Sequence, residues 1–155
     1  MKLSEIIVFD AVVPQLQATS KEDAIAELVQ ALASAGAIPK NSVNDVTKIV
    51  LDREAQATTG IGKGVALPHA KRKGIRKPIA TIGLSAEGID FAALDSKPVY
   101  SVLLLLSSPD GPDEHLQAME TIFKHVQRDM FRKFLRQSTT KEAVEILVGE
   151  ADELA

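Results

Sequence analysis

The sequence contains no cysteine and no tryptophan, and it has a single tyrosine. The absence of cysteine excludes disulfide bonds, thiolate catalysis and cysteine-ligated zinc. One tyrosine without tryptophan leaves little for a base-stacking surface. The net charge of −3 argues in the same direction, because an acidic chain has no overall electrostatic attraction to nucleic acid. We therefore expect no nucleic-acid partner.

Long apolar runs are also missing. The longest strongly apolar stretch, Val102 to Leu106, is far too short to span a bilayer. The N-terminus carries Glu5 where a signal peptide needs an uninterrupted apolar stretch. A length of 155 residues, with 45% hydrophobic and 25% charged residues, is typical of one globular domain. We expect a single domain over residues 1–155, located in the cytoplasm and not spanning a membrane.

Helical and strand patterns alternate along the chain. Apolar residues spaced three and four apart predict five helices, over residues 19–34, about 41–54, 113–126, 130–137 and 140–148. Capping boxes are predicted at Thr19 and Thr139. Short apolar runs predict strands over residues 65–67, 79–84 and 99–106, and residues 55–64 are predicted to be a loop. The fold expected is a three-layer α/β/α domain, with a small mixed sheet flanked by helices.

The run Val99 to Leu106 is nearly continuous in apolar residues. A strand of this kind is covered on both faces, so we expect it to lie in the centre of the sheet. Strand order does not follow from the sequence.

The segment from residue 58 to residue 71 carries the strongest chemical signal. Alternating glycines can adopt positive φ angles and point backbone N–H groups at an anion, and two threonine hydroxyls precede them. The candidate anion-binding residues are Thr58, Thr59, Gly60, Gly62 and Gly64. The segment is not a nucleoside-triphosphate loop, because such a loop needs glycine where Ala57 stands and serine or threonine where Gly64 stands.

His69 is the candidate nucleophile. It follows Pro68 at the end of a short predicted strand, which fixes the side chain in place and leaves it accessible. An imidazole is substantially neutral at cellular pH, so it is a competent nucleophile there.

These residues resemble the phosphorylation-site signature of a known family. The pattern Gly60-x-Gly-x-Gly-x-Ala66-x-Pro68-His69-Ala70 is similar to that of the fructose/mannitol-type enzyme IIA domains of the bacterial phosphotransferase system. The likeness extends to Leu51–Glu54 upstream, to the segment from Phe91 to Leu106, and to His115-Leu116. It covers nearly the whole chain, from about residue 3 to residue 148.

The resemblance implies a phosphotransferase that works as a phosphocarrier. His69 would accept a phosphoryl group from the small protein HPr and donate it to a IIB domain for uptake of a fructose- or mannitol-like sugar. Any membrane association would be through a IIC complex. Arg53 matches the family's arginine near the site, which would clamp phosphoryl oxygens. His115 matches the second histidine of the family's site, which would donate a hydrogen bond to the phosphoryl group. The family uses no cofactor or metal, and none is expected here.

His125 and the basic run after His69 are both interpreted as solvated surface. His125 falls off the apolar face of its predicted helix, so a solvated surface residue is expected. The basic run from Lys71 to Lys77 is interpreted as a solvated loop.

Two other functions are left open. Nitrogen-type IIA proteins share the motif and act by binding partners according to their phosphorylation state. An anion-binding module without transfer is the third possibility. Ala70 favours the transport branch slightly, since alanine after the histidine is found in fructose-like members. Lys63 is a variable position that can affect partner choice.

Overall fold

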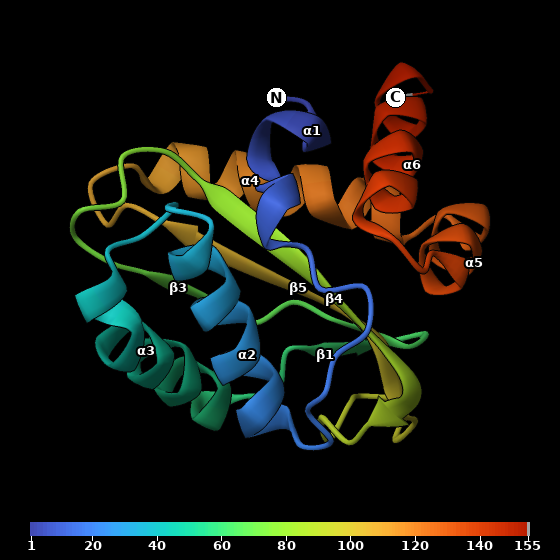
Figure 1. Cartoon of the computed structure of the whole chain (residues 1–155), viewed down its shortest axis with the longest axis horizontal. Coiled ribbons are helices and arrows are strands. Elements are labelled where there is room, and N and C mark those ends of the chain that lie inside the picture. Colours follow the sequence, from blue (N-terminus) through green and yellow to red (C-terminus); the bar gives the residue numbers. More distant parts are fainter. Residues whose placement is uncertain (155) are drawn as a thin grey trace.

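The computed structural model describes residues 1–154 and places a five-stranded mixed sheet between two layers of helices (Figure 1). One face of the sheet is covered by α2 (Lys21–Ser34) and α3 (Val43–Gln56). The other is covered by α1 (Leu3–Ile6), α4 (Pro112–Val126), α5 (Asp129–Gln137) and α6 (Lys141–Glu153). Two 3-10 turns, η1 (Phe9–Ala11) and η2 (Lys40–Ser42), complete the elements. The predicted α/β/α architecture is confirmed.

Strand β5 (Val99–Ser107) is the centre of the sheet. One edge pairs antiparallel with β4 (Ile79–Ile89). The other edge pairs in parallel with two short strands in succession, β2 (Val65–Ala66) and then β3 (His69–Lys71). Strand β1 (Gly60–Gly62) pairs antiparallel with β2. The expectation of a central strand is therefore confirmed.

The side chains of β5 alternate between the two cores, as the two-residue repeat of a strand requires. Val102, Leu104 and Leu106 pack in the core beneath α2 and α3. Leu103 and Leu105 pack in the core that contains residues of α1, α4, α5 and α6. Burial on both faces explains why this segment is apolar at nearly every position.

The helix caps lie one residue later than predicted. Ser20 caps α2, because its hydroxyl accepts the Asp23 N–H at 3.1 Å. Thr140 caps α6, accepting the Ala143 N–H at 3.0 Å. Each cap reaches the third residue of its helix, the usual partner of such a side chain. The predicted capping boxes at Thr19 and Thr139 are therefore wrong by one position.

The predicted loop over residues 55–64 is partly regular structure. Helix α3 continues to Gln56, and residues 60–62 form β1. Sequence patterns also missed α1, η1 and β3, each of which is only three or four residues long. Elements this short contain too few residues for a hydrophobic period to be recognised.

His125 is buried, with 1% of its surface exposed, so the prediction of a solvated surface residue is wrong. The buried face of α4 contains Ala118, Ile122 and Val126 as well, whereas Leu116 is 57% exposed. The sequence pattern predicted that the buried face of this helix is the one that carries the large apolar side chains, Leu116 among them. Helix α4 instead turns its small Ala118 inward.

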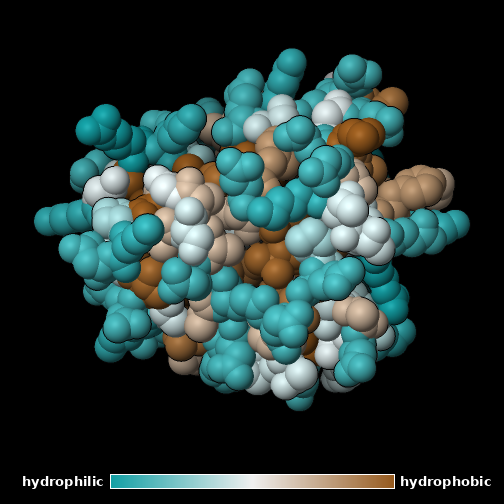
Figure 2. Space-filling view, viewed as in Figure 1, coloured by the Kyte–Doolittle hydropathy of each residue, from teal (hydrophilic) through white to brown (hydrophobic). Residues whose placement is uncertain are grey.

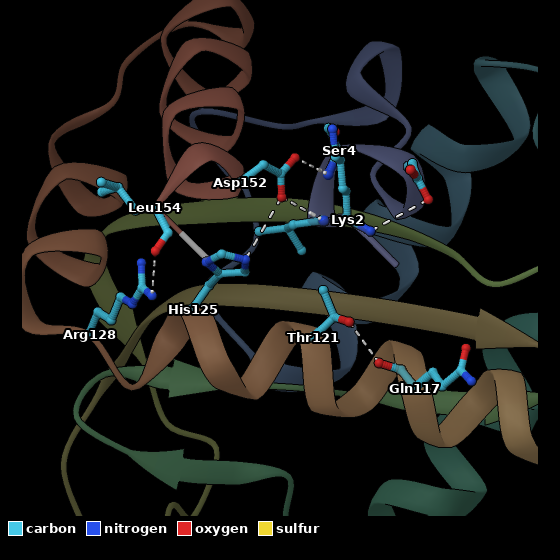
Figure 3. A network of polar contacts seen from close by, with 10 residues as sticks. Lys2, Ser4, Gln117, Thr121, His125, Arg128, Asp152 and Leu154 are labelled. Carbon is cyan, nitrogen blue, oxygen red and sulfur yellow. Dashed lines mark hydrogen bonds and ion pairs between the residues drawn. The ribbon is translucent and has the colours of Figure 1, made fainter.

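The His125 ring lies in a polar network that joins both ends of the chain (Figure 3). Its Nε2 is 3.9 Å from a carboxylate oxygen of Asp152 in α6. The same carboxylate accepts the backbone N–H groups of Leu3 at 2.8 Å and Ser4 at 3.0 Å. Asp152 therefore satisfies N–H groups at the start of α1, which otherwise have no partner within that helix.

One face of the molecule is largely polar. Hydrophilic side chains cover most of the face seen in Figure 2, with an apolar patch in its middle. Among residues 1–154, no helix combines the length and the apolar character needed to cross a membrane.

Candidate functional site

His69 lies on the edge strand β3, where it pairs with Leu105 of β5. Its Nδ1 is 2.8 Å from the carbonyl oxygen of Leu67. A carbonyl can only accept, so this contact places the ring hydrogen on Nδ1. The second nitrogen, Nε2, is then the atom with a free lone pair. The backbone thus fixes both the orientation of the ring and its tautomer.

His115 lies in the first turn of α4 and faces His69. The two ring centroids are 5.7 Å apart and the ring planes are inclined at 46°. Nδ1 of His115 makes a short contact with the hydroxyl of Ser107, the fully buried last residue of β5. The predicted proximity of the two histidines is confirmed, whereas the supporting role of Ser107 was missed, since nothing in the sequence links it to His115.

An open cleft of about 490 Å³ contains both histidines. Helix α3 supplies one wall, and β3 and α4 supply the rest. Arg53 lines this cleft near the end of α3, and its guanidinium donates to the Ala57 carbonyl at 3.0 Å. The lining residues are Ile49, Asp52, Arg53, Gln56, His69, Ala70, Lys71 and His115. Three predicted site residues therefore meet in one cleft: His69, His115 and Arg53.

Both histidines are biased towards the neutral form. Burial lowers the pKa of His69; the Leu67 carbonyl opposes this, and Arg53 lowers the pKa further. Burial also lowers the pKa of His115, and the positive charges that His69 and Lys71 can carry act in the same direction. A neutral His69 retains the nucleophilic lone pair that an imidazolium lacks.

The two threonines have their hydroxyl hydrogens engaged inside the protein. Thr59 is 5% exposed; its hydroxyl and its N–H donate to the two carboxylate oxygens of Glu54, at 2.5 and 2.8 Å. Thr58 donates its hydroxyl to the Phe91 carbonyl at 2.6 Å. The prediction that both hydroxyls donate to an anion is thus not supported. Glu54 ties the end of α3 to the strand leading to His69, a role that sequence reasoning missed.

The glycines also lie outside the histidine cleft. Gly60 pairs with Ala66 in the β1–β2 hairpin, and a Cβ at this position would lie 2.8 Å from Ala93. Gly62, the last residue of β1, and Gly64, in the two-residue turn that follows, have φ angles of 97° and 79°. They enable the tight turn and the close strand packing. None of them lines the cleft of His69, and their role in binding an anion there stays a prediction.

The basic run is only partly a solvated loop. Lys71 belongs to β3 and lines the histidine cleft. Arg72 donates its Nε to Asp45 of α3 at 2.8 Å. Lys73, Arg76 and Lys77 are exposed, as predicted.

Comparison with known proteins identifies relatives along almost the entire chain. Residues 5–149 match the family described as "Phosphoenolpyruvate-dependent sugar phosphotransferase system, EIIA 2". A fructose-specific EIIA component of Haloferax volcanii is 33% identical over 134 residues, which cover 86% of each chain. A nitrogen regulatory protein of Bradyrhizobium diazoefficiens is 31% identical over 144 residues, covering 93% of this chain and 92% of the relative.

A third relative is much longer than this chain. The fructose-specific EIIABC component of Bacillus subtilis is 29% identical over 152 residues. The match covers 98% of this chain but spans only 24% of the length of that protein.

Two solved structures share the fold. Nitrogen regulatory protein IIA-Ntr of Neisseria meningitidis superposes with a TM-score of 0.82 at 24% identity, covering 94% of this chain and 98% of the other. The complex of enzyme IIAMTL with phosphorylated enzyme IIBMTL from Escherichia coli contains a chain that superposes with a TM-score of 0.75 at 19% identity. The match covers 91% of this chain and 95% of the other.

Proposed function

The chain belongs to the EIIA 2 family of the phosphoenolpyruvate-dependent sugar phosphotransferase system, and we propose that it is a phosphocarrier that is phosphorylated on Nε2 of His69. The observation that carries the proposal is the hydrogen bond from Nδ1 of His69 to the Leu67 carbonyl. It leaves Nε2 as the nucleophilic atom, in a cleft that also contains His115 and Arg53.

The reaction is a phosphoryl exchange between two nitrogen atoms. Nε2 of His69 attacks the phosphorus of the phosphohistidine on HPr in line, and the bond from phosphorus to the donor nitrogen breaks. The donor ring carries a hydrogen on its other nitrogen, so it takes the electron pair of the broken bond and leaves as neutral imidazole without a further proton. His69 keeps its hydrogen on Nδ1, where the Leu67 carbonyl continues to accept it.

Two residues would stabilise the transferring group. The Arg53 guanidinium already donates to the Ala57 carbonyl, which holds it at the cleft with other N–H groups available for phosphoryl oxygens. If Ser107 donates to Nδ1 of His115, Nε2 of His115 carries a hydrogen and can donate it to the same group. A neutral donor binds phosphoryl oxygens less tightly than a second cation would, which suits a group that must leave again.

The surroundings of the cleft suit a protein partner. Leu116, adjacent to His115, is 57% exposed, and Ile49 lines the cleft beside Arg53. Leu116 is exposed and Ile49 is half-buried, so apolar surface lies on two sides of the reactive residues, and apolar surface of this kind suits contact with a protein. In the related structure, enzyme IIAMTL is in complex with phosphorylated enzyme IIBMTL. We infer that HPr is the phosphoryl donor and a IIB component the acceptor, for uptake of a fructose- or mannitol-like sugar.

A regulatory role is the second candidate. The nitrogen regulatory relative is 31% identical and the fructose-specific relative 33%, and the chain spans most of both proteins. In the regulatory case, the same phosphorylated His69 would change which partners bind around the cleft. Chemistry at His69 is common to both functions, and they differ in whether the phosphoryl group is passed to IIB.

Phosphoryl transfer with purified components tests the proposal. The chain is incubated with phosphoenolpyruvate, enzyme I and HPr, and its intact mass is measured beside those of His69→Ala and His125→Gln. We expect one acid-labile phosphoryl adduct on the wild type and on His125→Gln, and none on His69→Ala. An adduct of equal extent on His69→Ala would refute the assignment. Addition of fructose- and mannitol-type IIB proteins then separates the candidates, because only a transport protein loses its adduct to one of them.

A further inference from the structure

The glycine turn of the β1–β2 hairpin lines a second cleft, separate from the one containing His69. This cleft has a volume of about 480 Å³, within the range of small-molecule sites. Val65 of β2 pairs with Ser101 of β5, whereas His69 of β3 pairs with Leu105. The two sites are thus four residues apart along β5, or about 13 Å.

The second cleft is strongly basic in an acidic protein. Its lining includes four cationic side chains and one carboxylate, although the whole chain has a net charge of −3. The cations are Lys63 from the turn and Arg132, Lys133 and Arg136 from α5. The carboxylate, Asp129, pairs with Arg132. Within residues 1–154, the side chains of Lys63, Lys133 and Arg136 form no ion pair.

Arg136 is held in position without using its hydrogen-bond donors. Its guanidinium carbon lies 3.4 Å from the centroid of the Tyr100 ring. The ring is closely seated on two glycines, since a Cβ at Gly64 or Gly88 would lie 3.3 or 3.1 Å from its carbon atoms. A guanidinium stacked on an aromatic ring keeps its edge N–H groups free, and this edge matches the geometry of phosphate oxygens.

Lys63 is also placed by its backbone. Its φ angle is 59°, an unusual value for a residue other than glycine. Its backbone N–H donates to the carboxylate of Asp95 at 3.0 Å, and this bond attaches the turn to the loop between β4 and β5. The backbone conformation is therefore that of a glycine, yet the residue supplies a cation to the cleft.

We propose that this cleft binds a small phosphate-bearing anion between the glycine turn and α5. Three unpaired cations from two separate elements suit the double charge of a phosphate monoester or of free phosphate. The fixed guanidinium edge of Arg136 and the ammonium group of Lys63 contact its oxygens. The site lies outside the residues that carry the proposed phosphoryl transfer, so it provides binding and not chemistry.

Titration of the unphosphorylated chain, followed by amide NMR, tests this site. Inorganic phosphate and fructose 1-phosphate are added separately, to distinguish free phosphate from a phosphate monoester. With at least one of them we expect saturable shifts at Gly62, Lys63 and Tyr100, with a dissociation constant of about 1 mM or tighter. The same titration of His69→Ala must give the same affinity, which makes this test independent of the proposed transfer function.

Matched variants identify the binding residues. Arg136→Gln and Lys63→Gly each weaken binding by about tenfold or more, because each removes one charge-assisted contact. Glycine also suits the backbone at position 63, so Lys63→Gly is expected to fold. Lys40→Gln removes an exposed lysine of η2, outside the cleft, and leaves the affinity unchanged.

Three results would overturn the proposal. The first is a linear response to both anions, or shifts confined to residues around His69. The second is an equal loss of affinity in Lys40→Gln, which would mean attraction by overall charge. The third is that an acidic peptide binds saturably while neither inorganic phosphate nor fructose 1-phosphate binds, which would make the cleft a protein-docking surface.

Discussion

The rings of His69 and His115 face each other at a centroid distance of 5.7 Å because both are tied to the same end of β5. His69 pairs with Leu105 of that strand, and His115 contacts the side chain of Ser107. The central strand therefore sets the spacing of the two imidazoles. Neither histidine depends on a flexible loop for its position.

Loss of His115 should slow phosphoryl transfer without moving the phosphorylation site. We expect His115→Ala to reduce the rate of His69 phosphorylation by about a hundred- to a thousandfold, the usual cost of removing one donor that stabilises charge in the transition state. Rapid-quench measurement with phospho-HPr gives the rate, and peptide mapping gives the site. Ser107→Ala, which removes only the partner of His115, should have a smaller effect. An unchanged rate in His115→Ala would exclude contact with the phosphoryl group.

Replacement of Arg53 should show whether charge or shape matters at the cleft. Arg53→Gln loses the charge, and we expect slower transfer with His69 still phosphorylated. Arg53→Lys keeps the charge but not the planar fork, so its rate should fall between those of Arg53→Gln and the wild type. Both rates are measured under single-turnover conditions. If Arg53→Lys is as slow as Arg53→Gln, charge alone contributes little.

Glu54 should matter to stability more than an acid on the surface. The carboxylate is 4% exposed and accepts two hydrogen bonds from Thr59. In Glu54→Gln one carboxylate oxygen becomes an NH₂ group, which faces a donor of Thr59 and cannot accept its hydrogen bond. We therefore expect a loss of about 1–3 kcal/mol in the free energy of unfolding. Urea denaturation measures it. The control is Asp52→Asn, which breaks only the exposed pair with Lys48 and should change the free energy of unfolding far less.

The buried His125 should make the protein less stable in mild acid. Burial lowers the pKa of this residue; Asp152 opposes the effect, while Arg128 and Lys124 add to it. The folded pKa is therefore below the unfolded value of about 6.5, and the unfolded chain binds more protons as pH falls. The free energy of unfolding should thus decrease below about pH 6.5, by at most about 1.4 kcal/mol per pH unit for this group.

Urea denaturation between about pH 7.5 and about pH 5.5 tests this pH dependence. His125→Gln should show a flatter dependence than the wild type. Part of the slope should remain in that variant, because the pKa values of His69 and His115 are lowered as well. A slope as steep as that of the wild type would mean that His125 does not titrate on unfolding.

The elements with long apolar periods were predictable from the sequence, and those set by distant contacts were not. The run over residues 99–106 identified the central strand because both faces of it are buried. The burial of His125 depends on α6 and on the start of the chain, which pack against α4 from far away in sequence. The spacing of apolar residues within one helix contains no information about the distant elements that pack against it.

The candidate site was predicted in part for the same reason. The Pro-His sequence, the position of His115 in the first turn of its helix and the resemblance to the family together predicted that the two imidazoles lie close to each other. The glycines and threonines nearby in sequence were assigned to the same anion, although β1 and β2 carry the glycine turn away along the sheet. Glu54 as the acceptor for Thr59 required the chain path after α3, which only the structure provides.

The most direct test of the central claim is to determine which nitrogen carries the phosphoryl group. The chain, labelled with ¹⁵N in its histidines, is phosphorylated through HPr, and phosphorus–nitrogen couplings are measured by NMR. The Leu67 carbonyl holds the hydrogen on Nδ1 of His69, so the account predicts a single phosphohistidine at position 69, linked through Nε2. A phosphoryl group on Nδ1 of His69, or on His115 or His125, would contradict it.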